Sequence, residues 1–156
     1  MYNLYDYLHN GWTFLHNLLR PRHKTLTSLM IYSTTRCQSR CQHCSIWKKP
    51  AEHLSLDDIR WFDAHHPNYT LLSNALAPQK LNEMLEKHRP KHLYISLDGD
   101  KATYQHMRGV DGYEKVIQVI EQWHERIPIS LMFCLSPWNS FRDMQHVIAV
   151  AKHYHI

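Results

Sequence analysis

The sequence predicts an α/β fold, in which a parallel sheet is built from β/α units in series. Short, continuously apolar runs alternate with amphipathic stretches along most of the 156 residues. Buried parallel strands are typically apolar throughout, and four such units in a row favour right-handed crossovers between parallel strands. The result is either an open sheet or part of a (β/α) barrel. In both architectures ligands bind at the carboxyl ends of the strands.

The expected strands are the apolar runs SLMIYS at 28–33, YTLLSN at 69–74, HLYISL at 92–97 and ISLMFCL at 129–135. Successive side chains of a strand point to opposite faces of the sheet. In the run 92–97, Leu93, Ile95 and Leu97 are therefore expected to face covering helices. Ser96 and Asp98 are expected to face the other way, toward the interior if the sheet belongs to a barrel.

The expected helices are LSLDDIRWFDAHH at 54–66, APQKLNEMLEKHR at 77–89, GYEKVIQVIEQWHER at 112–126 and SFRDMQHVIAVAKHY at 140–154. Ser55 is suited to the N-cap of the first, because acidic residues follow in the first turn. Pro78 is suited to the first turn of the second. In the third, helical spacing indicates one apolar face, made of Val116, Ile117, Ile120 and Trp123.

Residues 1–24 do not follow the β/α rhythm and are expected to form an N-terminal helical extension, with residues 25–156 forming the domain. Apolar residues from Leu4 to Leu19 can form one face of a helix that is interrupted by Gly11 and ends before Pro21. The basic sequence RPRHK follows at 20–24. Such a helix either docks on the domain or makes a weak contact with a membrane surface.

The composition excludes several classes of protein. No segment reaches the roughly 20 apolar residues that span a bilayer, and the first residues lack the order of a signal peptide, so a cytoplasmic location is expected. The net charge of +4 comes from scattered residues, and without a basic stripe no nucleic-acid partner is expected. The 14 histidines are also dispersed and predict no histidine metal site.

Three cysteines lie close together in TTRCQSRCQHCSIW at 34–47, directly after the first expected strand. Cys37, Cys41 and Cys44 have the spacing C-x3-C-x2-C, while Cys134 is remote and is expected to be a small buried thiol. In a reducing compartment, clustered cysteines are metal ligands or catalytic thiols more often than disulfides.

Three interpretations of this cluster are possible. Positions i, i+4 and i+7 share a helix face, so the cysteines could be core residues, although polar residues surround them. Zinc is a second possibility, with His43 or His53 completing a tetrahedral set, but structural zinc often uses two separated pairs of ligands. The third is a [4Fe–4S] cluster, which usually takes four thiolates. With three, one iron would remain open to a small molecule.

The cysteine motif and a second segment resemble the radical S-adenosylmethionine (SAM) superfamily. C-x3-C-x2-C after a first strand is similar to the cluster motif of that superfamily. KHLYISLDGDKATYQHMRGVDGYEKVIQVIEQ at 91–122 resembles its fourth strand and the following helix, especially in the branch that modifies peptides and builds cofactors. The resemblance extends from about residue 28 to residue 156, and it includes NYTLLSNALAP at 68–78, which is similar to the family's third strand and T-N-G turn.

The resemblance implies an activity and a set of cofactors. The three cysteines would ligate a [4Fe–4S] cluster, and the amino and carboxylate groups of SAM would chelate its fourth iron. One electron from a donor would cleave SAM to methionine and a 5′-deoxyadenosyl radical, which abstracts hydrogen from a peptide or small-molecule precursor. His43, Ser96 and Asp98 are the expected contacts to SAM, and Arg108 would pair with its carboxylate. No catalytic side chain is assigned.

The sequence departs from the family pattern in two places. It has no Gly-Gly-Glu-Pro-like segment, which in the family ends the second strand and holds the SAM amino group. It also stops at AKHYHI, where a sixth strand would be expected to begin. The prediction is therefore a shortened (β/α)6 TIM-like barrel, with one unit and the C-terminal end missing. The alternative function is a non-catalytic iron–sulfur or zinc-binding remnant of that fold.

Overall fold

The computed structural model describes residues 4–20, 34–65 and 69–156, which fall into two compact units, Met1–Tyr32 and Ser33–Ile156. The expected strand at 28–33 lies outside the described residues, and so does the expected domain boundary between residues 24 and 25.

The first unit contains one described helix, α1, at Leu4–Leu19. The prediction that Gly11 interrupts this helix is wrong, because the helix runs through it and no other atom comes within 4 Å of where its Cβ would be. Large apolar side chains of α1, including Leu8, Trp12 and Leu18, are exposed. In the described parts of the chain no helix is both long enough and apolar enough to cross a membrane.

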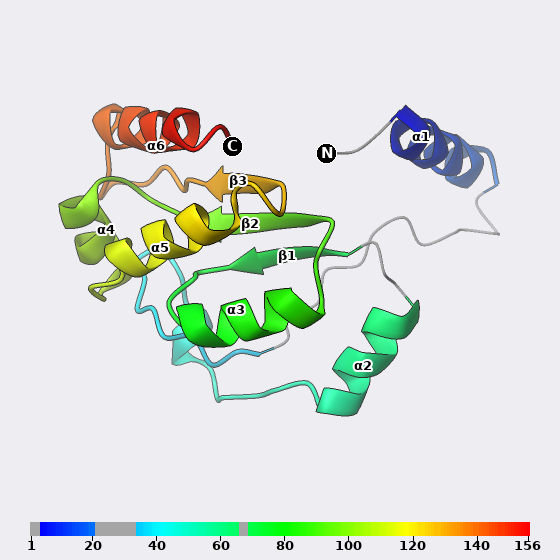
Figure 1. Cartoon of the computed structure of the whole chain (residues 1–156), viewed down its shortest axis with the longest axis horizontal. Helices are drawn as coiled ribbons and strands as arrows, with labels where there is room; N and C mark the ends of the chain where they lie inside the picture. Colours follow the sequence, from blue (N-terminus) through cyan, green and yellow to red (C-terminus); the bar gives the residue numbers. More distant parts are fainter. Residues whose placement is uncertain (1–3, 21–33, 66–68) are drawn as a thin grey trace. The chain divides into compact units, whose positions relative to one another are not determined.

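The second unit is built on a parallel sheet of three strands in the order β1-β2-β3, with β2 in the centre (Figure 1). These are β1 at Thr70–Ser73, β2 at His92–Ser96 and β3 at Ile129–Met132. The register aligns Leu71 of β1 with Leu93 of β2, and Leu93 with Ile129 of β3. The α/β class and the parallel pairing predicted from the sequence are confirmed.

Helices connect and flank these strands. They are the 3-10 helix η1 at Ile46–Lys48 and the α-helices α2 at Leu56–His65, α3 at Pro78–Lys87, α4 at Lys101–Arg108, α5 at Tyr113–Trp123 and α6 at Phe141–His153. Helix α5 packs against both α3 and α4, and α6 packs against β3. Helix and strand alternate as the sequence predicted, except that α4 was not expected.

The helix boundaries follow from local capping. Ser55 Oγ accepts a hydrogen bond from the Asp58 N–H at 3.1 Å, and Asp58 Oδ2 accepts one from the Ser55 N–H at 3.1 Å, so a capping box starts α2. A second capping box, between Ser140 and Asp143, starts α6. Pro78 occupies the first turn of α3, where its missing N–H costs no hydrogen bond.

The unexpected helix α4 has both of its ends specified by the sequence. Asp100 accepts a hydrogen bond from the Thr103 N–H at 2.9 Å and thus caps the N-terminus. Gly109 ends the helix with a φ of +62°, a left-handed conformation that glycine adopts readily. An aspartate and a glycine nine positions apart indicate a short helix, and the sequence-based assignment missed this signal.

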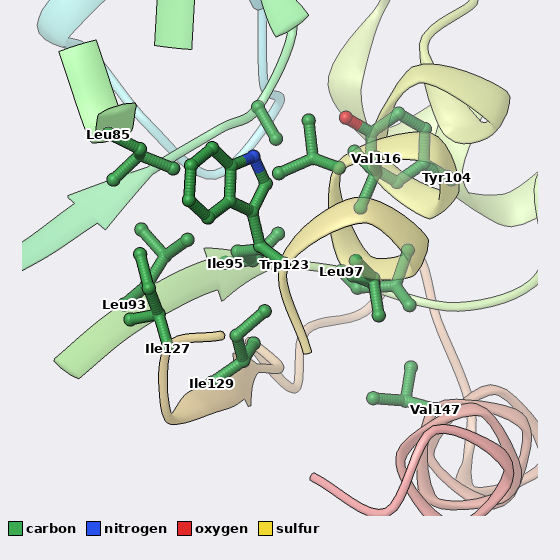
Figure 2. Close-up of a cluster of buried hydrophobic side chains, with 13 residues drawn as sticks. Leu85, Leu93, Ile95, Leu97, Tyr104, Val116, Trp123, Ile127, Ile129 and Val147 are labelled. Carbon is green, nitrogen blue, oxygen red and sulfur yellow. The ribbon is translucent and has the colours of Figure 1, made fainter. Parts of the chain in front are cut away.

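The hydrophobic core is formed by the sheet together with side chains of α3, α4, α5 and α6 (Figure 2). Leu93, Ile95 and Leu97 of the central strand region are fully buried, as their alternation predicted. Trp123 of α5 is also fully buried, and its indole N–H donates to Asn82 Oδ1 at 2.7 Å. The predicted apolar face of α5 is confirmed: Val116, Ile120 and Trp123 are fully buried and Ile117 packs against them.

Candidate metal centre

The three cysteines lie in one loop, residues 34–49, which we call the cysteine loop. Cys41 is buried at 5% exposure, Cys37 and Cys44 are half-buried, and all three thiols are free. The loop is irregular apart from η1, so the interpretation of i, i+4 and i+7 as one face of a core helix is wrong. All three thiols are available as ligands.

Backbone hydrogen bonds fix the cysteine loop against the C-terminal turn of α4. The Arg40 N–H donates to the Arg108 carbonyl at 2.8 Å, and the Gln42 N–H donates to the Met107 carbonyl at 3.0 Å. The last carbonyls of a helix lack partners within it, so these bonds complete α4 while they hold the loop. A Cβ on Gly109 would lie 3.2 Å from the Arg40 carbonyl oxygen, which shows how closely the two segments approach.

The start of the cysteine loop is also paired with the segment that follows the loop. An antiparallel bridge pairs Thr34 with His53, and the two side chains approach to 2.8 Å between Oγ1 and Nδ1. Inside the loop, the Trp47 indole N–H donates to the Cys41 carbonyl at 3.1 Å and the Cys44 N–H donates to the same oxygen at 3.3 Å. The half-buried ring of Trp47 thus fixes the backbone of the central cysteine.

Asn74 connects the cysteine loop to the carboxyl edge of the sheet. It directly follows β1, and its Nδ2 lies 3.5 Å from Cys37 Sγ and 3.5 Å from Gln38 Oε1. Cys37 therefore lies at the strand ends, the edge at which the sequence placed the cysteines. Because Asn74 is a polar residue at the end of a parallel strand, position alone could have marked it as a site residue.

Asp98 and Arg108, two of the expected SAM contacts, form a buried ion pair with each other. Asp98 Oδ2 accepts from Arg108 Nε at 2.6 Å and lies 2.5 Å from Nη2. The other carboxylate oxygen accepts from the Cys134 N–H at 2.9 Å. The carboxylate is fully buried and the guanidinium is 9% exposed, so each charge has a partner inside the protein. Both roles toward SAM remain predictions.

The charges around Cys41 act in opposite directions on its thiol. Burial raises the pKa of Cys41, while the Arg108 guanidinium and the Ser39 hydroxyl lower it and the neighbouring Cys37 and Cys44 raise it, with a net increase. Without a metal, Cys41 is therefore a protonated thiol at neutral pH. Because metals bind the thiolate, loading this site must release a proton, and Arg108 provides the nearby positive charge that favours the loaded form.

Two buried hydroxyl groups indicate whether an iron–sulfur cluster fits beside the cysteine loop. Ser39 Oγ and Tyr104 Oη are fully buried, and neither has a partner of good hydrogen-bond geometry among the described residues, although the Ser39 hydroxyl is close enough to the Cys41 thiol to lower its pKa. Buried hydroxyls in folded proteins almost always have an acceptor. Ser39 is two positions before Cys41 and acts on its thiol, so a thiolate or a sulfide of a bound cluster would supply the acceptor. Three soft thiolate donors also suit iron–sulfur chemistry.

The same geometry offers no ready site for a single ion. In residues 4–20, 34–65 and 69–156, no three or more Cys, His, Asp or Glu side chains are grouped so that they could hold a metal ion. A tetrahedral zinc site with bonds of about 2.3 Å would require its sulfur atoms about 3.8 Å apart. His43 is exposed, and His53 contacts Thr34 Oγ1 through its Nδ1 at 2.8 Å. A cubane cluster binds each thiolate to a different iron and so accepts a wider spacing.

The remaining predicted positions lie at the edges of this region. Ser96 is half-buried at the last position of β2. The expectation that Cys134 is a small buried thiol is wrong, because Cys134 is exposed. Strand β3 ends at Met132, so Cys134 lies beyond the strand that was expected to extend to residue 135. Its backbone N–H, not its thiol, makes the contact with Asp98.

Comparisons of the chain with protein-family models, with curated proteins and with solved structures found no match.

Proposed function

We propose that Cys37, Cys41 and Cys44 bind a [4Fe–4S] cluster and that the protein is a radical SAM-type enzyme. One observation carries the proposal: three free thiols with the C-x3-C-x2-C spacing lie on a loop held at the carboxyl edge of a parallel sheet. In this proposal the three described strands are part of a shortened (β/α) barrel. The resemblance of the sequence supports the assignment, and the buried hydroxyl of Ser39 adds a donor that acts on the Cys41 sulfur.

Cys37, Cys41 and Cys44 would hold the cluster, which when bound would supply the one-electron reduction of the SAM sulfonium that releases methionine and a 5′-deoxyadenosyl radical. The chain's own residues hold and shield the reactants. The cysteine loop excludes water from Cys41 by packing against α4, because Cys41 is only 5% exposed. Arg108 offsets the negative charge of the thiolates. Its guanidinium has five N–H groups, so it can contact a carboxylate in addition to Asp98.

The second candidate function is a non-catalytic iron–sulfur protein. Two observations favour it. Asp98 and Arg108 already satisfy each other inside the protein, so a SAM carboxylate would have to compete with an existing buried ion pair. The sequence also lacks the glycine-rich segment that holds the SAM amino group in the resembling family. In this alternative the same three cysteines hold the cluster, and the protein acts through a partner.

Anaerobic reconstitution of the full chain with iron and sulfide tests the metal assignment. The wild type is expected to turn brown and to contain about four iron and four sulfide per chain. Cys37→Ala, Cys41→Ala and Cys44→Ala should each remove the visible absorption. Cys134→Ala is the matched control, because its exposed thiol lies outside the cysteine loop and it should retain the cluster. A colourless protein that binds zinc would overturn both iron–sulfur functions.

Product analysis separates the enzyme from the non-catalytic protein. The reconstituted wild type is mixed with SAM and a low-potential one-electron reductant, and 5′-deoxyadenosine and methionine are quantified. Equal amounts of the two products, absent from the three cysteine variants, support the radical SAM assignment. A stable cluster without either product supports the non-catalytic iron–sulfur protein.

A further inference from the structure

Asn74 makes the one direct contact that the described residues show between a polar side chain outside the cysteine loop and a cysteine sulfur of that loop. Its amide Nδ2 lies 3.5 Å from Cys37 Sγ. Sulfur is a large, weak acceptor as a thiol and becomes a stronger one when it carries negative charge. Asn74 is therefore placed to donate to the Cys37 thiolate when that thiolate binds iron.

The orientation of the Asn74 amide is fixed by its other end. Asn74 Oδ1 accepts a hydrogen bond from the Leu76 N–H at 3.2 Å, and only the oxygen of the amide can accept. The NH2 group must then point away from Leu76, toward Cys37 and the side-chain oxygen of Gln38. The hydrogen bond to Oδ1 thus fixes which end of the Asn74 amide is the NH2 group, and that group faces Cys37 Sγ.

The turn that carries Asn74 is itself held in an unusual conformation. Ala75 has a φ of +54°, in the left-handed region that residues with a Cβ avoid. Ala75 is 1% exposed, and its N–H donates to Ser73 Oγ at 3.0 Å. Such conformations persist only where the surroundings determine them, and they are frequent at functional sites. Here the conformation presents the Asn74 side chain to the cysteine loop immediately after β1.

We propose that Asn74 is a positioning residue for Cys37 and that its N–H···S hydrogen bond raises the reduction potential of the cluster. This inference rests on the proposed function. Reduction adds negative charge to the cluster and its thiolates, so a donor to one of those sulfurs stabilises the reduced form more than the oxidised form. Partners of a metal ligand also fix its orientation. Asn74 is then a determinant of how readily the protein accepts an electron.

The test is a redox titration of the reconstituted full chain, followed by the EPR signal of the reduced cluster. Asn74→Ala removes the donor and is expected to lower the ratio of reduced to oxidised cluster about tenfold at a fixed ambient potential, a shift of about 59 mV for one electron. Asn74→Asp keeps the acceptor for Leu76 but replaces the donor by a negative charge, so its potential is expected to fall further.

Asn139→Ala is the matched control. Asn139 also holds a turn after a strand, since its Oδ1 accepts from the Ser136 N–H at 2.9 Å and its Nδ2 donates to the Cys134 carbonyl at 2.9 Å. No hydrogen bond of the described residues joins it to the cysteine loop, so the potential should stay at the wild-type value.

The outcomes separate this inference from the proposed function. A wild type that assembles no cluster overturns both. A wild type with a cluster whose potential is unchanged in Asn74→Ala and Asn74→Asp overturns the role of Asn74 and leaves the proposed function standing. Loss of the cluster from both Asn74 variants, while their thermal unfolding and the cluster of Asn139→Ala stay intact, supports the positioning role.

Discussion

Ser39 carries a fully buried hydroxyl that acts on the weakly accepting Cys41 thiol but makes no hydrogen bond of good geometry among the described residues. A buried polar group without a partner costs about 1–3 kcal/mol. In the metal-free protein, Ser39→Ala is therefore expected to raise the free energy of unfolding by about 1 kcal/mol, measured by urea denaturation. In the reconstituted protein the same substitution should weaken retention of the cluster, because the hydroxyl then has a sulfur acceptor to lose.

Ser140→Ala is the control for that prediction. Ser140 Oγ is part of the capping box of α6, so its removal should lower the free energy of unfolding by about 1 kcal/mol. The two serines are thus expected to give opposite signs in the metal-free protein. If Ser39→Ala instead destabilises the metal-free protein, the Ser39 hydroxyl is already satisfied there and does not need a cluster as its acceptor.

Tyr104 provides a pH-dependent prediction. Burial raises the pKa of Tyr104 to about 12, with the charges of Cys41 and Asp98 adding to the increase and Arg108 opposing it. The unfolded chain ionises near pH 10, so folding stability contributed by this group is complete below pH 10 and is lost as the pH rises toward 12. The loss amounts to about 2–3 kcal/mol. Urea denaturation at several pH values should show this decline in the wild type and a smaller one in Tyr104→Phe.

The pairing of Asp98 with Arg108 shows what single residues in a sequence do not reveal. The resemblance assigns both residues to SAM and does not indicate that they pair with each other. Their side chains meet because α4 turns the chain back toward the end of β2, a turn that the sequence assignment did not contain. A buried charge needs a partner, but nothing in the sequence shows that Asp98 and Arg108, ten positions apart, become partners in the fold.

At the scale of elements, the sequence predicted those helices whose ends are fixed by local chemistry. The hydrogen-bonded cap at Ser55 and the first-turn position of Pro78 are short-range features, so they can be read without the fold. The break expected at Gly11 does not occur, because the effect of one glycine depends on the rest of the helix. One glycine costs a helix only about 1 kcal/mol, which the neighbouring residues of α1 can offset.

Gly109 connects the end of α4 to the cysteine loop and gives an element-scale prediction. Its φ is +62°, and a Cβ would lie 3.2 Å from both the carbonyl oxygen and the Cβ of Arg40. Gly109→Ala should lower the free energy of unfolding by about 1–2 kcal/mol from backbone strain alone. Because the crowded neighbour is the cysteine loop, cluster content after reconstitution should fall as well.

Gly11→Ala is the matched control for Gly109→Ala. Its Cβ would meet nothing within 4 Å, and an alanine inside a helix is favoured over glycine by about 0.5–1 kcal/mol. Far-UV circular dichroism should show equal or greater helicity, and cluster content should be unchanged. Normal cluster assembly in Gly109→Ala would show that the contact between α4 and the loop does not matter for metal binding.

At the scale of the whole molecule, the features expected for cluster binding are more complete than those expected for SAM binding. The cysteine loop is complete and is held by α4, by its own closure and by Asn74. Of the groups expected to bind SAM, His43 is exposed, Ser96 is half-buried at the end of β2, and Arg108 is already paired with Asp98. The cysteine spacing could be read directly from the sequence, because three ligands on one short loop need no tertiary information.

We therefore expect the protein to assemble its cluster more readily than it binds SAM. Losing one or two buried hydrogen bonds to a charged group costs on the order of 2–5 kcal/mol, or roughly 30-fold to several thousand-fold in affinity. The measurement is a titration of the reduced, reconstituted protein with SAM, followed by the EPR signal of the cluster. The signal should change only as SAM approaches the millimolar range, about −4 kcal/mol of binding, with slow or no release of 5′-deoxyadenosine. A change at micromolar SAM with rapid release would show that Arg108 and its neighbours suffice for SAM binding, and the non-catalytic alternative would be ruled out.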